Sequence, residues 1–387
     1  MAQSRTGVAN PAKAADRIRV LESKAAASPG DRSVTAALIS AYLQKLRETA
    51  DGTYLELASR LTTRLIQQDG GSVIALRFQN EVDLQRHEFK AVAERAGDMV
   101  KYEPSDPGLW GNLGDALMEL GEYERAGQAY TRMRSLRSGL ASLNRAGYHR
   151  FVIGDAGGAI AFLTQAIEAG GDGENTAWCW AELGDMYFKT GAFARAEKAY
   201  NAGLALFPGL HRAYAGLGQV HAERKQFEEA IRNYERALAM VPMIEYAGAL
   251  ENLYESVGQV KKAETQRRLI ETIATLGRAG KEQTNRTLVL ILANHGRDLN
   301  HALELIQTEI PIRGSVYTWD ALSWVLFKLG RIPEARAASL KAIRMMTPEP
   351  DFYLHATQIA DASGDVAEAA KYRERQLALR AGEALKQ

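Results

Sequence analysis

Seven histidines and one cysteine are the residue types in this sequence that could hold a metal ion or act as a nucleophile. The tightest grouping is His295-Gly-Arg-Asp298-Leu-Asn-His301, which offers two imidazoles and a carboxylate. A metal site needs ligands that converge and that outer partners hold in place. Because this segment is expected to span the turn of a helical hairpin, its side chains would point in different directions. We therefore interpret them as solvated turn residues and predict no metal site.

Motifs for nucleophilic catalysis or phosphate binding are not found in the sequence. Cys179 has no histidine near it in sequence, and no Ser-x-x-Lys occurs with a supporting base. The phosphate loop GxxxxGK, a GxGxxG after a strand and H-E-x-x-H do not occur either. A lone cysteine cannot form an intramolecular disulfide, and we expect Cys179 to be an inert, partly buried thiol. The sequence predicts no catalytic residue, no cofactor and a protein that is not an enzyme.

The composition is that of an ordinary globular chain. Its 387 residues are 46% hydrophobic and 25% charged, which allows a large core. Lys and Arg total 48 against 47 Asp and Glu, and the net charge of +1 shows no basic excess for nucleic acid. No apolar run approaches the roughly 18–20 residues that span a bilayer. The start has no apolar signal region, so the default location is cytoplasmic; a trimmed mature form would instead be periplasmic or secreted.

Two stretches repeat at an offset of 34 residues: Trp180-x-x-Leu183-Gly184-x-x-Tyr187 and Tyr214-x-x-Leu217-Gly218-x-x-His221. The offset continues in matched pairs further along the chain, at Ala196 and Ala230, Tyr200 and Tyr234, and Pro208 and Pro242. The period and the residue types resemble the tetratricopeptide repeat, a helix–turn–helix unit of about 34 residues. The chain is similar to a group of bacterial tetratricopeptide proteins, several of them exported, whose role is not well defined. This resemblance implies no catalytic residue.

Residue types at fixed repeat positions have physical roles. A small residue at position 8 is expected where the two helices of a unit cross closely, as at Gly114, Gly147, Gly184 and Gly218. A small residue at position 20 is expected to be its partner on the second helix. An aromatic residue at position 24 is expected to fill the space between hairpins, as at Tyr130, Tyr200 and Tyr234. Two later units carry Glu251 and Leu290 at position 8, and there we expect a different tilt or a break in the array.

These patterns predict an all-α fold: an α-solenoid with a right-handed superhelix of about 9–10 tetratricopeptide-type helix–turn–helix units. Residues 1–12 are predicted to be disordered, and residues 13–70 to form a cap helix and an irregular hairpin. The repeat array is predicted over residues 71–385. Its repeats are strongest at 107–244, weaker at 244–315 and regular again at 316–380. A polar capping helix is expected at its C-terminal end, and residues 277–280 are expected to add a looser turn.

The resemblance implies that the first helix of each unit lines a concave groove, with positions 2, 5, 9, 12 and 13 facing it. Those positions give the candidate partner-binding residues Asp115, Tyr148, Trp178, Asp185, Phe188, Lys189, Gln219, Asn252, Trp324, Phe327 and Lys328. Trp178 and Trp324 do not fit the core positions and are expected to be exposed. We predict that the functional surface centres on Trp178, Asp185, Phe188 and Lys189; the competing view is that Phe188 turns inward and packs against the next hairpin.

Acidic residues outnumber basic ones at the groove positions. The acids are Asp83, Asp115, Glu119, Asp185, Glu223, Glu245, Glu255, Asp320, Asp351 and Asp361, and the bases are Lys189, Arg212 and Lys328. A groove of that sign would attract a basic or neutral protein or peptide. Position 5 is never basic, which disfavours a clamp for a C-terminal carboxylate. We expect a monomer or a weak oligomer.

The sequence therefore favours a protein–protein interaction scaffold that binds a partner peptide or protein segment in the concave groove. The alternative is an assembly factor or co-chaperone for a larger bacterial complex, possibly at the envelope. Since a fold does not fix a function, both readings stay open.

Overall fold

The computed structural model describes residues 11–68, 71–279 and 285–382. The described residues form helices and connecting turns, with no β-strand among them. The helices are α1 (Pro11–Ala27), α2 (Arg32–Thr49), α3 (Gly52–Gln68), α4 (Val73–Gln85), α5 (Phe89–Tyr102), α6 (Pro107–Leu120), α7 (Tyr123–Leu136), α8 (Leu140–Val152), α9 (Ala156–Ala169), α10 (Glu174–Lys189), α11 (Phe193–Leu206), α12 (His211–Glu223), α13 (Phe227–Met240), α14 (Ile244–Ser256), α15 (Val260–Ala279), α16 (Arg286–Asn294), α17 (Leu299–Glu309), α18 (Val316–Lys328), α19 (Ile332–Ile343), α20 (Pro350–Ala362) and α21 (Val366–Arg380).

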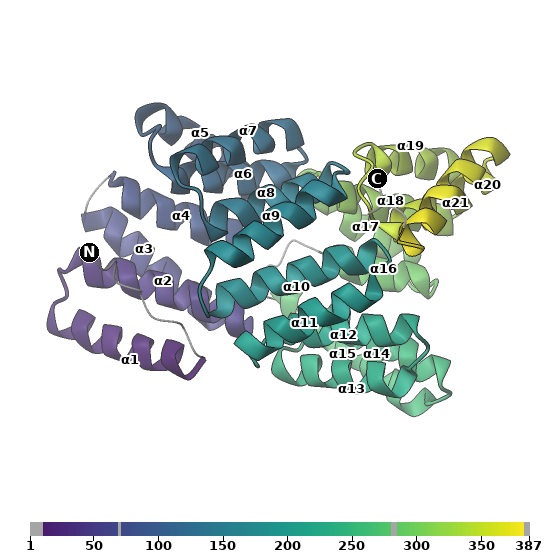
Figure 1. Cartoon of the computed structure of the whole chain (residues 1–387), viewed down its shortest axis with the longest axis horizontal. Coiled ribbons are helices and arrows are strands. Elements are labelled where there is room, and N and C mark those ends of the chain that lie inside the picture. The colour runs from purple at the N-terminus through teal and green to yellow at the C-terminus, as the bar shows by residue number, and fades with distance from the viewer. Residues whose placement is uncertain (1–10, 69–70, 280–284, 383–387) are drawn as a thin grey trace.

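Helices α2 to α21 pair in chain order as hairpins, from α2 with α3 to α20 with α21, and α1 packs against α2 (Figure 1). The predicted all-α solenoid of about 9–10 units is thereby confirmed for the described residues. The disorder expected for residues 1–12 lies outside the described residues up to residue 10, and α1 begins at Pro11. The looser turn expected from residue 277 is wrong as far as residue 279, because α15 continues to Ala279; a single glycine costs a helix only about 1 kcal/mol.

Local sequence signals set the helix ends. At the start of α6, the Asp106 carboxylate accepts the backbone N–H of Gly108 at 2.7 Å, and Pro107 occupies the first turn. Proline suits that place because its missing N–H would have no helical partner there. At the far end, Gly121 adopts the left-handed backbone (φ 79°) that reverses the chain into α7.

In the hairpins of Gly114, Gly184 and Gly218 an aromatic ring packs against the glycine, whereas Leu163 takes this place against Gly147. A Cβ atom built on Gly184 would lie 2.5 Å from Cε1 of Tyr200, and one built on Gly216 of the next unit would lie 2.3 Å from the same atom. The Tyr200 ring is therefore held between its own hairpin and the following one, with none of its surface exposed. The same contact recurs between Gly114 and Tyr130. The small residue at position 8 thus makes room for the ring at position 24, rather than chiefly for the alanine at position 20.

The unit with a large residue at position 8 keeps the hairpin by a different chemistry. Glu251 is fully buried, and its carboxylate accepts hydrogen bonds from Arg267 Nε at 2.9 Å and from Arg297 Nη2 at 3.0 Å. Arg267 occupies position 24, so an ion pair replaces the glycine and tyrosine of the regular units. The hairpin itself forms, because α14 and α15 still pair, and α14 also contacts α16 of the next unit. The expected difference in tilt at this unit stays a prediction.

The array also folds back on itself, so that segments nearly two hundred residues apart lie in contact. The backbone N–H of Val316 donates to the Tyr123 hydroxyl at 2.8 Å across 193 residues. The Thr347 hydroxyl donates to the carbonyl of Val152 at 2.6 Å across 195 residues. A Cβ atom on Gly121 would lie 2.5 Å from the carbonyl oxygen of Gly314. The turns inside the hairpins of one part of the array therefore meet the connections between hairpins of a later part.

Ion pairs also join these distant segments. Arg313, which precedes α18, pairs with Glu119 of α6, and Lys189 Nζ of α10 lies 2.6 Å from Glu349 before α20. Arg380 at the end of α21 reaches Glu223 of α12 at 3.3 Å. Figure 1 shows the later helices α16–α21, in green to yellow, beside α8 and α10. We call this set of contacts the closure; the repeat pattern did not predict it.

The ring contact gives a stability test. Gly184→Leu places a side chain where the Tyr200 ring lies, and overpacking of this kind costs about 1–3 kcal/mol. The matched control is Gly171→Leu, since a Cβ atom there would meet no atom within 4 Å. We expect urea unfolding to show the loss for Gly184→Leu alone; equal midpoints for the two variants would mean that the repeat register is misassigned.

Candidate functional site

A hollow of about 690 Å³ lies on the side of the array that the first helices form. Side chains of α2, α4, α6, α8 and α10 line it, together with Arg313 from the closure. We call this hollow the groove. Among the predicted partner-binding residues, Asp115, Tyr148 and Trp178 line it.

Asp115 is held by a hydrogen-bonded triad that joins two units. Its Oδ1 accepts from the Tyr130 hydroxyl at 2.9 Å and from Arg145 Nε at 2.8 Å. Its Oδ2 accepts from Arg145 Nη2 at 2.7 Å. Tyr130 belongs to the same hairpin and Arg145 to the next one, so the carboxylate links neighbouring units. Burial raises the pKa of Tyr130 well above its ordinary value, which keeps its hydroxyl a donor.

The same arrangement recurs two units later, at Asp185 of α10. The Tyr200 hydroxyl donates to Asp185 Oδ1 at 2.7 Å, and Arg212 Nε donates to Asp185 Oδ2 at 2.9 Å. The guanidinium of Arg212 also lies over the ring of Trp178, 4.7 Å from its centre. Asp185 and Trp178 were both predicted to contact a partner. In the structure the carboxylate is committed to Tyr200 and Arg212, and the indole is half-buried beneath Arg212.

Most of the acidic residues predicted to line the groove form an ion pair with a basic side chain. Those with an arginine or histidine within ion-pair distance are Asp83, Asp115, Glu119, Asp185, Glu223, Glu255, Asp320 and Asp361. A count of acids along the first helices therefore overstates the free negative charge. The sequence analysis missed these pairs because most of the basic partners lie outside the groove positions that it counted.

Among the described residues of the groove, Glu81 and Asn112 have polar atoms without a hydrogen-bond partner, as does Glu174 at Oε2. Glu81 of α4 has no basic side chain within ion-pair distance among the described residues, and burial raises the pKa of its carboxyl. Asn112 of α6 is 5% exposed, and its Oδ1 accepts no hydrogen bond from the described residues. Burying polar groups without partners is costly. Both residues line the groove, so a ligand there could supply the missing bonds.

The other residues of the predicted central patch face the closure or their own hairpin. Lys189 pairs with Glu349 and lies over the rings of Phe151 and Tyr317, at 5.5 and 5.6 Å from their centres. Phe188 is half-buried, with its ring 5.5 Å from that of Phe193. The Phe188 ring thus contacts α11 of its own hairpin. Tyr148 is half-buried and packs beside Tyr317 and the core around α6.

The expectation that Trp324 is an exposed aromatic is wrong. It is 5% exposed, its Nε1 donates to Asn294 Oδ1 at 2.7 Å, and its ring stacks on His355 with 4.0 Å between centres. Helices α16 and α20 bury it from both sides, which the position rule for a single unit cannot show. Phe327 is half-buried against Trp324, while Lys328, Gln219 and Asn252 are exposed as predicted residues of a surface should be.

His295 contacts two glutamates of α14, which the sequence analysis did not predict. Nitrogen atoms of His295 lie 3.9 Å from Glu251 and 3.8 Å from Glu255, so three possible metal ligands do come together. Arg267 and Arg297 already neutralise Glu251, and His301 faces Glu304 instead. His295 is therefore more buried than a solvated turn residue and has more contacts, but the two arginines already supply the positive charge that a metal ion would bring to Glu251.

Cys179 is 1% exposed, and burial raises the pKa of its thiol to about 12, as expected for an inert cysteine.

The pair of His355 and Asp320 gives a pH test. The two are buried together, with Nδ1 3.0 Å from Oδ1. Burial alone would lower the pKa of His355, but the charge and hydrogen bond of Asp320 outweigh it and raise the pKa. The stabilisation is then fully present below the unfolded pKa of about 6.5 and lost as pH rises through the folded pKa. We expect the melting temperature of the protein to exceed that of His355→Gln by more near pH 6 than near pH 9; a constant gap would contradict a charged His355.

Comparison with known proteins agrees with this geometry. The sequence profile of the tetratricopeptide repeat matches residues 74–141 and 181–243. No curated protein matches the chain in sequence. The structure of the anaphase-promoting-complex hetero-tetramer Cut9–Hcn1 is similar at a TM-score of 0.55 and 12% identity, over 92% of this chain and 59% of that one. The chain thus spans 59% of the length of that relative.

Two further solved structures are similar at lower scores. The human IFIT1 dimer with PPP-AAAA has a TM-score of 0.48 and 14% identity, with 94% of each chain covered. MamA has a TM-score of 0.36 and 22% identity, over 43% of this chain and 97% of that one. No described helix is long and apolar enough to cross a membrane. The chain thus contains stretches that match the tetratricopeptide repeat, and its paired helices share the fold of Cut9–Hcn1 over the described residues.

Proposed function

We propose that the protein is a non-enzymatic scaffold that binds a segment of a partner protein in the groove. Repeats of this family generally mediate protein–protein interaction. The observation that carries the proposal is a hollow of about 690 Å³ that contains an unpaired carboxylate, Glu81, and an unpaired amide oxygen, Asn112 Oδ1. Both are acceptors that a partner's donors would satisfy.

The charges of the groove favour a basic side chain on that partner. Its acidic residues are Glu81, Asp115, Glu119, Glu174 and Glu182, and its arginines are Arg47, Arg145 and Arg313. His87 adds no charge near neutral pH, because burial lowers its pKa to about 4. A lysine or arginine of the partner would neutralise the negative charge of Glu81. The hydrogen bond between a charged donor and a carboxylate is also a strong one.

An extended partner would leave the groove along later first helices. Gln219 of α12, Asn252 of α14 and Lys328 of α18 are exposed there and keep their predicted role as contacts. Trp178 offers the apolar wall of the groove, with Arg212 fixing its ring. A role in assembling a larger complex would use the same groove, so it stays a hypothesis that the identity of the partner decides.

Peptide selection tests this proposal. Random dodecapeptides displayed on phage are selected on the intact protein, and the recovered peptides are measured against Glu81→Lys and Glu94→Lys. Glu94 is exposed on α5, outside the groove, so the second variant matches the change of charge. We expect a class of peptides rich in Lys or Arg whose affinity falls at least about tenfold on Glu81→Lys, since losing a buried charge partner costs about 2–5 kcal/mol, and is kept by Glu94→Lys. Basic peptides that bind both variants equally would contradict the groove as their site.

A further inference from the structure

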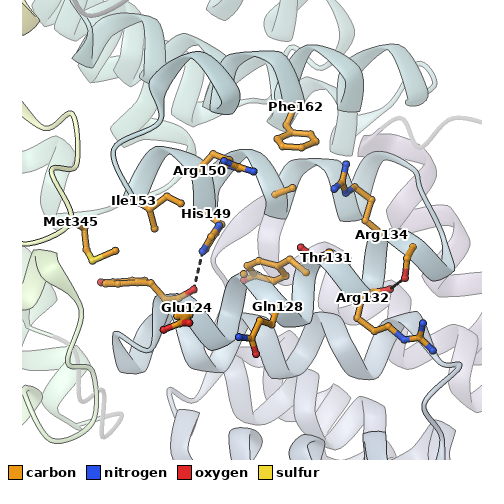
Figure 2. Close-up of a pocket in the computed structure, with 15 residues that line it drawn as sticks. Glu124, Gln128, Thr131, Arg132, Arg134, His149, Arg150, Ile153, Phe162 and Met345 are labelled. Atoms are coloured by element: carbon orange, nitrogen blue, oxygen red, sulfur yellow. Dashed lines mark hydrogen bonds between the residues drawn. The ribbon is translucent and has the colours of Figure 1, made fainter.

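A second hollow, of about 850 Å³, is lined largely by second helices, whereas first helices supply most of the groove lining (Figure 2). Its walls are the second helices α7 and α9, and the first helix α8 passes between them. Met345, from the connection after α19, closes one end. We call this hollow the outer trough. Its exposed lining residues include Glu124, Gln128, Thr131 and Arg132, so the trough is open along its length.

Packing between the helices keeps the outer trough open. A Cβ atom on Gly127 would lie 2.6 Å from Cε1 of His149, so α7 presents a bare backbone where the imidazole of α8 lies. His149 Nε2 is 2.8 Å from the carbonyl oxygen of Tyr123, which fixes the ring. Burial lowers the pKa of His149, so it is a neutral part of the wall near pH 7.

The trough has an apolar end and a basic end. Ile153 and Met345 lie at one end, near Glu124, and Arg132 and Arg134 lie at the other (Figure 2). Neither Arg132 nor Arg134 has a carboxylate within ion-pair distance among the described residues, and Arg132 Nη2 donates to the carbonyl of Pro104 at 3.5 Å. Arg134 lies over the Phe162 ring, 4.9 Å from its centre, and a guanidinium stacked this way keeps its N–H edge free. Arg150 is paired with Asp155 at 3.2 Å.

We propose that the outer trough binds an acidic segment of a partner protein, with carboxylates at Arg132 and Arg134 and an apolar side chain toward Ile153 and Met345. The unpaired guanidinium groups match carboxylates in charge and in two-pronged geometry. An open trough with exposed sides suits a chain that lies across it. A nucleic acid fits less well, because only two of the described arginines that line the trough lack a carboxylate partner and the chain as a whole carries a net charge of +1.

This site differs in sign from the groove, and it also depends on the closure. Met345 comes from the later part of the array, while Tyr123, which lines the trough, binds the backbone of Val316 across the closure. An acidic segment in the trough therefore contacts both parts of the array at once. The protein then has two docking surfaces, one for a basic segment and one for an acidic segment.

The test uses peptides of both signs on the intact protein. Random dodecapeptides displayed on phage are selected on the wild type, and each recovered peptide is measured against three variants. These are Arg132→Ala with Arg134→Ala, the charge-matched control Arg125→Ala with Arg268→Ala, and Glu81→Lys. Arg125 and Arg268 are exposed arginines outside the trough, each paired with a glutamate three or four residues before it. A twelve-nucleotide oligoadenylate is measured in parallel.

We expect a peptide class rich in Asp or Glu, with a large apolar residue, whose affinity falls at least tenfold on Arg132→Ala with Arg134→Ala. The control and Glu81→Lys should bind it as the wild type does, which separates this site from the groove. The proposal is overturned if no acidic class is recovered or if its affinity is unchanged by the loss of Arg132 and Arg134. Tighter binding of the oligoadenylate than of any acidic peptide also overturns it.

Discussion

The closure of the array on itself is the constraint on which both candidate surfaces depend. The turn after α6 meets the connection before α18, where Tyr123 accepts the N–H of Val316 at 2.8 Å and Glu119 pairs with Arg313. Without that contact Arg313 would not line the groove, and Met345 would not close the outer trough. An open solenoid contacts only neighbouring units and bends easily. This one is held by bonds that bypass its neighbours, so its two surfaces keep a fixed relation.

The sequence predicted the parts of the fold that arise within a unit and its neighbour. Position 8 and position 24 are sixteen residues apart, as Gly184 and Tyr200 are, so their pairing repeats with the period and can be found by it. The exception follows the same logic, since Glu251 and Arg267 occupy those positions and form a buried ion pair. Each solution fills the space where the helices cross, either with a ring against bare backbone or with two charges that satisfy each other.

The site was harder to predict because its side chains bond to residues that the 34-residue repeat period does not identify. Asp185 lies on the first helix α10, but its carboxylate bonds Tyr200 and Arg212. Trp324 is buried by His355 of α20 and Asn294 of α16, neither of which belongs to its own unit. Glu81 is not at a position that the resemblance assigns to the groove, and Arg77, four residues before it on the same helix, makes it resemble a paired surface acid in the sequence. The closure joins residues 193 and 195 apart, beyond the reach of any repeat comparison.

The most direct measurement compares two glycines that occupy equivalent turns. Gly121 and Gly258 both have a left-handed backbone, with φ of 79° and 74°, so alanine carries the same cost of about 1–2 kcal/mol at each. A Cβ atom on Gly121 would lie 2.5 Å from the Gly314 carbonyl oxygen across the closure, whereas one on Gly258 would meet nothing within 4 Å. Urea unfolding measures the loss of stability for Gly121→Ala and for Gly258→Ala. The difference between the two losses is the part that comes from the closure, because the cost of alanine in the turn is the same in both. The closed array predicts a clearly larger loss of stability for Gly121→Ala; equal losses for the two variants would contradict it.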